Sequence, residues 1–295
     1  MLDVVIIGSG PAGITAAIYA KRANLNVAVV EKEYLGTGQI AESSRVDNYP
    51  GIPGIDGYSL GEKFREHAES LGVEFTEAQV LSLGQKDGIW IIGCDEDITL
   101  ESKAVIYATG CKNRPLGVPG EEKYYGRGLS FCAVCDGAFY KGKRVAVIGG
   151  GDTALDDAMY LSDICEKVYL VHRREFFRGS ASTLEKLKQK ENVEIIVNAR
   201  VEEITGDKKI DGIILDNKTK LNISGLFAAV GMIPQTELLK EFGVLDESNY
   251  VKASEDTKTT VNGLFAAGDV RTKQLRQVVT AAADGANAIY SVMEY

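Results

Sequence analysis

Length, composition and charge exclude several classes of protein. The chain has 295 residues, of which 45% are apolar and 25% charged, as is typical of soluble globular proteins that are long enough for two domains. A net charge of −9 argues against a general binder of nucleic acid or of anionic membranes. No apolar run approaches the roughly 18 residues of a membrane span. The first residues resemble a strand rather than an export signal, so we expect a cytoplasmic protein.

One internal repeat predicts the fold. Its first copy comprises a strand, a Gly-rich turn, a helix and a strand, at residues 4–7, 8–13, 14–23 and 27–31. The second copy has the same order, at residues 144–148, 149–154, 155–161 and 168–171. Such units pair their strands in parallel. The predicted fold class is therefore α/β, with two Rossmann-like (three-layer ββα) dinucleotide-binding domains, the second inserted into the first.

The end of the chain is predicted to complete the first domain. Residues 261–269 read as a strand that ends in a polar turn, and residues 274–294 as an Ala-rich helix. A stretch with Gly and Pro at 111–120 and a stretch with Gly at 241–246 are the predicted joints. The expected domains are 1–113 plus 245–295, and 114–244.

The first Gly-rich turn matches the dinucleotide fingerprint at Gly8, Gly10 and Gly13, with Pro11 and Ala12 inside the turn. The glycines permit a tight turn, close approach to a pyrophosphate and close packing of the helix. Glu31 ends the next strand, where an acid accepts hydrogen bonds from a ribose and repels a 2′-phosphate. The turn therefore predicts FAD or NAD rather than NADP, and a purely structural turn is the alternative.

The second Gly-rich turn differs at the end of its second strand. Gly149, Gly150 and Gly151 supply the loop, and Asp152 and Thr153 enter the helix. No acid follows the next strand, which leads instead into His172, Arg173, Arg174 and Arg178. Guanidinium groups bind phosphate in a bidentate fork, so this turn predicts the 2′-phosphate of NADPH. A solvated basic turn is the alternative.

The cysteines divide into isolated and paired residues. Five is an odd number, which suits a reducing cytoplasm better than a disulfide scaffold. Cys94, Cys111 and Cys165 stand alone and are expected to be buried as small apolar residues. Cys132 and Cys135 are separated by two residues.

The Cys132 and Cys135 pair has three interpretations. Half of a zinc site would need a second pair of ligands, and a purely structural pair is the second interpretation. The third is a redox dithiol, because this spacing at the start of a helix brings two sulfurs within disulfide distance and lowers a thiol pKa. Asp136 follows directly as a possible proton donor or acceptor, although an acid is also common in a first helical turn.

Together these motifs resemble those of bacterial low-molecular-weight thioredoxin reductases, which belong to the pyridine nucleotide-disulphide oxidoreductase family. Further matching segments lie at residues 46–51, 108–110, 126–128, 266–269 and 276–278. The resemblance covers nearly the whole chain and implies a homodimeric thioredoxin-disulfide reductase with one non-covalent FAD per subunit. It implies electron transfer from NADPH to FAD, then to the Cys132–Cys135 disulfide and finally to thioredoxin. It also implies that the NADPH-binding domain, which carries the disulfide, rotates against the FAD-binding domain.

The resemblance also implies site residues. The implied FAD contacts are Gly8, Gly10, Pro11, Ala12, Gly13, Glu31, Gly38, Gln39, Asn48, Thr109, Gly110, Gly268, Asp269, Arg276, Gln277 and Val278. The implied NADPH contacts are Gly149, Gly150, Gly151, Asp152, Thr153, His172, Arg173, Arg174 and Arg178. Cys132 is expected to attack thioredoxin, with Cys135 nearer the flavin, Asp136 as the acid and Arg127 as a docking contact. The chain departs from the family pattern at Gly36-Thr37-Gly38-Gln39 and at Gly231-Met232.

Four other functions share some of these features. A peroxiredoxin-reducing flavoprotein normally carries extra N-terminal domains, whereas this chain is expected to start on its first nucleotide-binding strand. A ferredoxin–NADP reductase lacks the cysteine pair, and a ferredoxin-linked thioredoxin reductase lacks the arginine cluster. A non-catalytic flavin or nucleotide sensor has no need of a dithiol followed by an acid.

Overall fold

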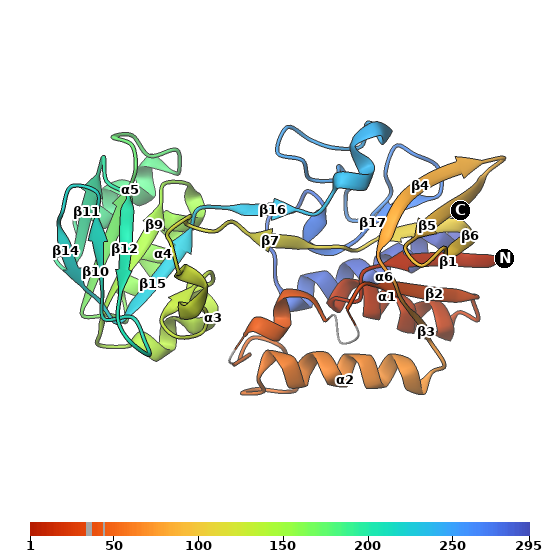
Figure 1. Cartoon of the computed structure of the whole chain (residues 1–295), viewed down its shortest axis with the longest axis horizontal. Coiled ribbons are helices and arrows are strands. Elements are labelled where there is room, and N and C mark those ends of the chain that lie inside the picture. The colour runs from red at the N-terminus through yellow and green to blue at the C-terminus, as the bar shows by residue number, and fades with distance from the viewer. Residues whose placement is uncertain (34–36, 44) are drawn as a thin grey trace. The chain divides into compact units, whose positions relative to one another are not determined.

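The computed structural model describes residues 1–33, 37–43 and 45–295 and divides the chain into two compact units (Figure 1). Unit 1 comprises Met1–Lys112 and Ile233–Tyr295, and unit 2 comprises Asn113–Met232. The chain leaves unit 1 on β7 (Cys111–Asn113) and returns on β16 (Met232–Pro234), and these two strands pair with each other. The second unit is therefore inserted into the first, as the internal repeat predicts.

The return to unit 1 lies earlier than the predicted boundary at 244/245. The Gln235 backbone N–H donates to the carbonyl oxygen of Gly110 at 3.1 Å, and its side chain donates to that of Thr109 at 2.6 Å. Leu239 is fully buried in a core cluster of unit 1. Gly243, in the predicted joint at 241–246, forms a left-handed turn inside unit 1 (φ 68°) and does not separate two domains.

Unit 1 is built on a mostly parallel sheet in the order β3-β2-β1-β6-β5-β4, with β17 also paired to β6. Its parallel strands are β1 (Leu2–Ile7), β2 (Val27–Glu31), β3 (Glu74–Glu77), β6 (Thr99–Tyr107) and β17 (Leu264–Ala266). Antiparallel strands β4 (Val80–Lys86) and β5 (Ile89–Cys94) extend it. The long β6 pairs with β5 through its first half, where Ser102 opposes Trp90, and with β17 through its second half.

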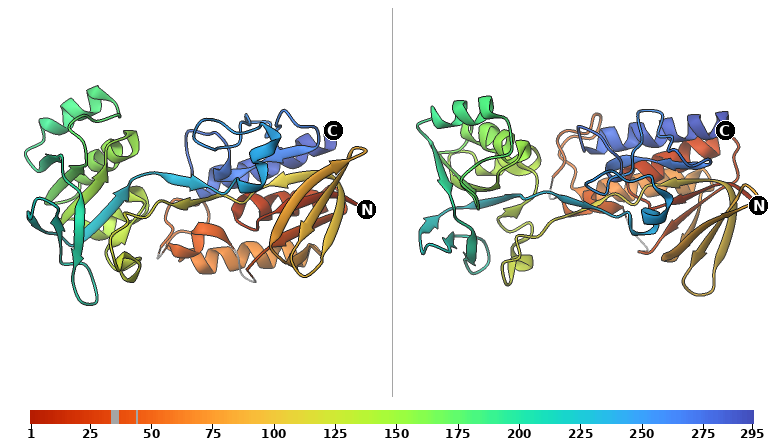
Figure 2. Two further views of the ribbon diagram at one scale, coloured as in Figure 1. Left: turned by 45° about the horizontal axis from the view of Figure 1, so that its top comes forward. Right: turned by 90° about the horizontal axis from the view of Figure 1, so that it is seen from above.

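Alternation along β1 produces two cores in unit 1. Val4 and Ile6 face a cluster with α1 (Pro11–Arg22) and α6 (Val278–Glu294), whereas Val5 and Ile7 face the opposite cluster around Trp90. The two views of Figure 2 show α1 and α6 side by side on one face of the sheet. A Cβ atom on Gly285 would lie 2.2 Å from the Ala12 carbonyl oxygen, so only glycine permits this close helix packing. Helix α2 (Gly57–Ser70) packs beside α1.

The last helix starts later than the predicted residue 274. Gln277 is extended (φ −146°, ψ 160°) and its backbone N–H donates to the Thr280 hydroxyl at 3.1 Å, which caps α6 at Val278. The predicted strand at 261–269 is likewise shorter, since it forms only at Leu264–Ala266 after a turn at Gly263. None of the helices in the described part of the chain has the length and apolarity that a bilayer crossing requires.

Unit 2 also contains a parallel sheet covered by helices on one face. Its antiparallel strands form a separate second sheet, whereas those of unit 1 extend the main sheet. Its parallel strands follow the order β11 (Val193–Val197), β10 (Lys167–His172), β9 (Arg144–Gly149), β15 (Gly225–Ala229) and β8 (Leu129–Ser130). The antiparallel sheet contains β12 (Val201–Thr205), β13 (Gly212–Leu215) and β14 (Lys220–Asn222). The helices are α3 (Ala133–Asp136), α4 (Asp152–Ser162) and α5 (Ala181–Lys188). Val145 and Val147 face the helices, whereas Ala146 and Ile148 face the antiparallel sheet, which gives the predicted three-layer ββα architecture.

Short 3-10 helices connect these elements. They are η1 (Gly38–Glu42), η2 (Glu121–Tyr124), η3 (Gly137–Tyr140), η4 (Glu237–Phe242) and η5 (Gly268–Val270). Three of them bear on the site: η1 and η5 lie in unit 1 beside the first Gly-rich turn, and η3 follows the cysteine pair in unit 2.

Candidate active site

The first Gly-rich turn leaves room for a ligand at one of its three glycines. A Cβ atom on Gly8 (φ 102°) would lie 2.6 Å from the Ala108 carbonyl oxygen, and one on Gly13 would lie 1.9 Å from that of Gly8. At Gly10 the nearest neighbouring atom among the described residues would be 3.8 Å away. The protein's own packing therefore requires Gly8 and Gly13, whereas Gly10 borders open space at the N-terminus of α1. Among the described residues, no side chain caps this helix end, which keeps its first N–H groups available to a phosphate.

Glu31 is tied to this turn through Ser9. One carboxylate oxygen of Glu31 accepts hydrogen bonds from the Ser9 backbone at 2.9 Å and hydroxyl at 3.1 Å, and the other accepts from the Lys32 backbone at 2.8 Å. These donors orient the acid at the end of β2. An ionised carboxylate there offers only acceptor atoms, which fits a ribose hydroxyl and disfavours a second phosphate.

Gly38 of η1 also approaches the turn. A Cβ atom on Gly38 (φ 72°) would lie 3.4 Å from the Cα atom of Gly10. Gln39 follows it in η1, and Val278 at the start of α6 packs in the same small cluster as Ile40. Gly36, one of the positions that depart from the family pattern, lies outside the described residues.

The side chain of Asp269 in η5 has one buried oxygen atom without a hydrogen-bond partner among the described residues. This atom is Oδ1. Burial raises the pKa of Asp269, while the charges of Lys273 and Arg276 oppose this rise. Leaving a buried acceptor unpaired costs about 1–3 kcal/mol. This atom therefore indicates a ligand that donates a hydrogen bond, and the ribityl hydroxyls of FAD fit that requirement.

The main chain around Asp269 is held from several sides. Its carbonyl oxygen accepts from the Cys111 thiol at 3.0 Å and from Arg276 Nε at 3.3 Å. The Gly268 N–H donates to Asp284 at 2.8 Å. Arg276 also stacks on Tyr250, with 4.2 Å between the guanidinium carbon and the ring centroid.

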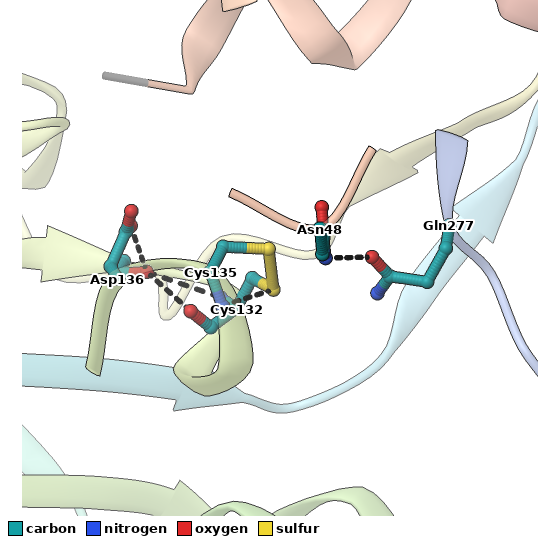
Figure 3. The surroundings of a disulfide bond; sticks show 6 residues. Asn48, Cys132, Cys135, Asp136 and Gln277 are labelled. Atoms are coloured by element: carbon teal, nitrogen blue, oxygen red, sulfur yellow. Dashed lines mark hydrogen bonds between the residues drawn. A yellow bond between two sulfur atoms is a disulfide. The ribbon is translucent and has the colours of Figure 1, made fainter. Parts of the chain in front are cut away.

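Asn48, Gln277, Thr109 and Gly110 complete the predicted residues of unit 1. Asn48 donates to the side-chain oxygen of Gln277 at 2.9 Å, a contact drawn in Figure 3. The Thr109 hydroxyl donates to the Gln235 carbonyl oxygen at 2.8 Å, and Gly110 is left-handed (φ 67°). These residues follow the carboxyl ends of the parallel strands or lie beside them. This edge of the sheet is where doubly wound folds bind dinucleotides.

The second Gly-rich turn, which lies in unit 2, likewise combines glycines that the packing requires with one glycine that could admit a ligand. A Cβ atom on Gly149 would lie 2.4 Å from the Ala229 carbonyl oxygen, and one on Gly150 would lie 2.2 Å from the His172 ring. A Cβ atom on Gly151 would have no described atom within 4 Å. His172 is buried against Phe177, with 4.9 Å between ring centroids. Its Nε2 atom has no hydrogen-bond partner among the described residues, and burial lowers the pKa of His172.

The arginine cluster is anchored to this turn through its backbone. The Arg178 N–H donates to the Gly150 carbonyl oxygen at 2.7 Å, and the Ser180 N–H donates to the Asp152 carboxylate at 2.7 Å. Gly179 lies so close that a Cβ atom there would be 2.8 Å from the Asp152 nitrogen. The side chains of Arg173, Arg174 and Arg178 are exposed. The turn thus carries guanidinium groups at the end of β10, where unit 1 has Glu31.

Cys132 and Cys135 form a disulfide at the start of α3, with their Cα atoms 5.3 Å apart (Figure 3). Cys132 is the N-cap residue, and its sulfur accepts a hydrogen bond from the Cys135 backbone N–H at 3.2 Å. Val134 between them is 57% exposed, so the pair lies at the surface of unit 2. Their pairing with each other argues against half of a zinc site. The backbone donor would stabilise a thiolate on Cys132 after reduction.

Asp136 lies next to the disulfide in a partly buried site. Burial raises the pKa of Asp136, and a hydrogen bond from Ser130 opposes this rise. The Ser130 hydroxyl and the Asp136 Oδ2 atom are 2.6 Å apart, whereas Oδ1 is buried and lacks a partner among the described residues. Arg127, the predicted docking contact, is exposed in the turn that precedes β8.

Comparison with known proteins identifies the family. The family model described as pyridine nucleotide-disulphide oxidoreductase matches residues 2–285. The thioredoxin reductase of Bacillus subtilis (strain 168) is 38% identical over 301 residues, which cover 99% of this chain and 94% of that protein. The chain belongs to the pyridine nucleotide-disulphide oxidoreductase family, among its low-molecular-weight thioredoxin reductases.

Two solved structures support the assignment. Thioredoxin reductase from Streptococcus pyogenes MGAS5005 is 40% identical, with a TM-score of 0.92 and coverage of 100% of this chain and 98% of that one. A ferredoxin-flavin thioredoxin reductase from Clostridium acetobutylicum is 31% identical, with a TM-score of 0.54 and coverage of 99% and 97%. The chain is thus an oxidoreductase and a flavoprotein with a redox-active disulfide, and its family implies binding of FAD and NAD(P)H.

Several residues that matter to the site were not singled out from the sequence. Ser130, Arg271, Lys273 and Asp284 act through contacts with residues 6 to 16 positions away. Ser130 carried one local signal, because a serine shortly before a helix is a common capping residue. Asp284 lies in an Ala-rich helix and carried no such signal.

Proposed function

We propose that this flavoprotein is an NADPH-dependent thioredoxin-disulfide reductase. The observation that carries the proposal is the Cys132–Cys135 disulfide beside Asp136, on the same unit as the arginine-flanked Gly-rich turn. A dithiol followed by a partly buried acid has the groups required for exchange with a disulfide substrate. The arginines supply a reason to prefer NADPH over NADH.

In this proposal the two units hold different nucleotides. Unit 1 binds FAD through the position at Gly10, the acid Glu31 and the Asp269 oxygen that lacks a partner among the described residues. Unit 2 binds NADPH through the open space at Gly151 and through Arg173, Arg174 and Arg178. Bound FAD would supply a carrier of two electrons between the nicotinamide and the disulfide.

The chain's own groups account for exchange with thioredoxin. After reduction, the Cys132 thiolate is stabilised by the Cys135 N–H and attacks the disulfide of thioredoxin. One substrate sulfur joins Cys132 in a mixed disulfide, and the other leaves as a thiolate that takes a proton from Asp136. Cys135 passes its proton to the Asp136 carboxylate and attacks the Cys132 sulfur, which re-forms the intramolecular disulfide and releases the second substrate sulfur as a thiolate. One disulfide is reduced and one is formed, so atoms and electrons balance.

The surface around the dithiol suits a protein substrate. Val134 and Phe139 are exposed apolar residues close to the pair in sequence, and Arg127 adds positive charge to an acidic protein. We infer that thioredoxin docks there. We also infer a homodimer, for which Tyr19 of α1 and Tyr290 of α6 offer exposed apolar surface on unit 1. A cytoplasmic location suits the free, buried thiols of Cys94, Cys111 and Cys165.

The deciding experiment is anaerobic reduction of the purified protein in its flavin-bound state. Rapid loss of visible flavin absorbance with NADPH, much slower loss with NADH, and reoxidation on adding thioredoxin would support the proposal. A ferredoxin-type donor is the second candidate, because a ferredoxin-flavin enzyme is among the structural relatives. No bleaching by either nucleotide, together with bleaching by reduced ferredoxin, would favour that donor. Bleaching without reoxidation by thioredoxin would contradict the proposed substrate.

A further inference from the structure

Ser130 connects Asp136 to the backbone of Cys132. It is the last residue of β8 and is 6% exposed. Its hydroxyl oxygen lies 2.6 Å from the Asp136 Oδ2 atom, 3.1 Å from the Cys132 backbone nitrogen and 3.4 Å from the Cys132 carbonyl oxygen. One hydroxyl thus contacts both the acid and the first cysteine of the pair.

The hydrogen bonds that the Ser130 hydroxyl can form differ between the ionised and the protonated form of Asp136. A hydroxyl has one proton to donate and two lone pairs that accept. With Asp136 ionised, the proton points to Oδ2, and a separation of 2.6 Å is typical of a charge-assisted bond between oxygens. With Asp136 protonated, the acid can donate to the Ser130 oxygen, and the serine proton can turn to the Cys132 carbonyl. The Cys132 N–H donates to the same oxygen in both states.

We propose that Ser130 is a positioning residue that fixes the side chain of Asp136, which follows Cys135 directly in the chain, and satisfies this acid in both of its protonation states. The inference rests on the proposed function, in which Asp136 delivers a proton to a leaving thiolate. That transfer converts a carboxylic acid and a thiolate into a carboxylate and a thiol. In the carboxylate that forms, Oδ1 is buried and has no hydrogen-bond partner among the described residues. The hydrogen bond from the Ser130 hydroxyl to Oδ2 is therefore the one that stabilises this carboxylate within the described part of the chain.

Other titratable groups lie beside the acid in the chain or on the elements that pack against α3. They are Cys132 at the N-cap of α3, Cys135 in α3, Tyr140 of η3 and, on the α4 helix that packs against α3, Asp156, Asp157 and Tyr160. The pKa of Tyr140 is raised by burial and by the charge of Asp136. Burial raises the pKa of Asp157 to about 7, with a further contribution from Asp156. These groups are the same in every variant below, so a change in pH dependence reports the Ser130 hydroxyl.

The test uses leaving groups of different basicity. The flavin-bound protein is reduced with dithiothreitol, freed of excess reagent and mixed with bis(2-hydroxyethyl) disulfide or with 5,5′-dithiobis(2-nitrobenzoate). The alkyl thiolate is basic and needs a proton as it leaves, whereas the aromatic thiolate is a good leaving group without one. We expect Ser130→Ala to slow reaction with the alkyl disulfide about ten-fold, a modest part of what general acids contribute, and to leave the aromatic disulfide nearly unchanged. The pH at which the alkyl rate falls should also rise, because the ionised acid loses its donor.

Three variants separate positioning from structure. Ser130→Thr keeps the hydroxyl and should react with both probes as the unmodified protein does. Adding Ser130→Ala to Asp136→Asn should change the alkyl rate no further. Ser162→Ala is the matched control, since Ser162 is equally buried in unit 2 and its hydroxyl donates to the Met159 carbonyl oxygen at 2.6 Å. It should react normally with both probes.

Two results would overturn the proposal: equal slowing of both probes by Ser130→Ala, or no slowing of either. Neither result depends on the electron donor or on thioredoxin, because the dithiol is reduced chemically. Failure of the proposed function would appear instead as an unchanged flavin spectrum after NADPH is added.

Discussion

Cys135 has two roles in the proposed exchange, and serine can take over only the first, because that one belongs to the backbone. It donates its N–H to the Cys132 sulfur, and its own sulfur resolves the mixed disulfide. We therefore predict that Cys135→Ser keeps bound FAD, whose proposed contacts all lie in unit 1, but loses thioredoxin turnover. Mass spectrometry should detect thioredoxin trapped on Cys132, and visible absorbance should report unchanged FAD content. Full turnover in this variant would exclude the dithiol mechanism.

The arginines of unit 2 lead to a prediction about nucleotide choice. Arg173 and Arg178 are exposed beside the second turn, and hydrogen bonds to charged groups contribute about 1.5–3 kcal/mol each. The double variant Arg173→Ala with Arg178→Ala should raise KM for NADPH at least about ten-fold and change KM for NADH little. Arg200→Ala, at an exposed arginine just before β12, serves as the control. Equal effects on the two nucleotides would mean that these side chains do not bind the 2′-phosphate.

At the scale of elements, a buried ionic network fastens α6 to η5. Asp284 of α6 accepts from Arg271 through both carboxylate oxygens at 2.7 and 2.8 Å, from Lys273 at 2.9 Å and from the Gly268 N–H at 2.8 Å. Arg271 and Asp284 are each 2% exposed. Burial would raise the pKa of Asp284, but these hydrogen bonds outweigh it and lower the pKa. The network fixes the turn that presents Asp269.

Removing this acid should damage both stability and cofactor retention. Asp284→Ala leaves two buried cations without their acid, and breaking buried pairs costs about 3–5 kcal/mol. Denaturant unfolding should show this loss, and gel filtration should show weaker FAD retention. The matched control is Glu255→Gln, since Glu255 bonds the same Arg271 at 3.2 Å but its side chain is 87% exposed, so its cost should stay below about 1 kcal/mol. Equal costs would show that burial does not decide the strength of this network.

The same network predicts a pH dependence of stability. The folded state holds the pKa of Asp284 below its unfolded value of about 3.9. Its contribution is therefore complete above that unfolded value and is lost as pH falls through the lower folded value. Comparing unfolding free energies with Asp284→Asn should show the difference between the two proteins shrinking only in strong acid. A difference that shrank near neutral pH would contradict the assignment.

At the scale of the molecule, the two units have separate cores. Unit 2 is one continuous segment with core clusters on both faces of its own sheet. We predict that residues 113–232 alone fold cooperatively, form the Cys132–Cys135 disulfide and bind NADPH but no FAD. Calorimetric titration with NADPH and with FAD would check this. A fragment that stays unfolded, or that binds FAD, would contradict the division of roles between the units.

Much of the candidate site has signals that are local in the sequence. The glycines of both turns, Glu31, the arginines after β10 and the pair Cys132 and Cys135 lie within short stretches whose spacing already implies the chemistry. The strands and helices next to the turns form at these positions because each has a continuous apolar pattern. The inserted second unit followed from the repeat of that pattern.

Tertiary structure decided what depends on distant partners. Gln235 moves the domain boundary because it bonds Thr109 and Gly110, and Asp284 becomes critical only when α6 brings it to Arg271 and Gly268. Gly150 is required because the His172 ring packs against it. The Ser130 hydroxyl bonds Asp136 because the short turn between β8 and α3 brings the two side chains together. A sequence shows which groups are present, but the strength of a hydrogen bond or charge depends on burial and on the partner that the fold supplies.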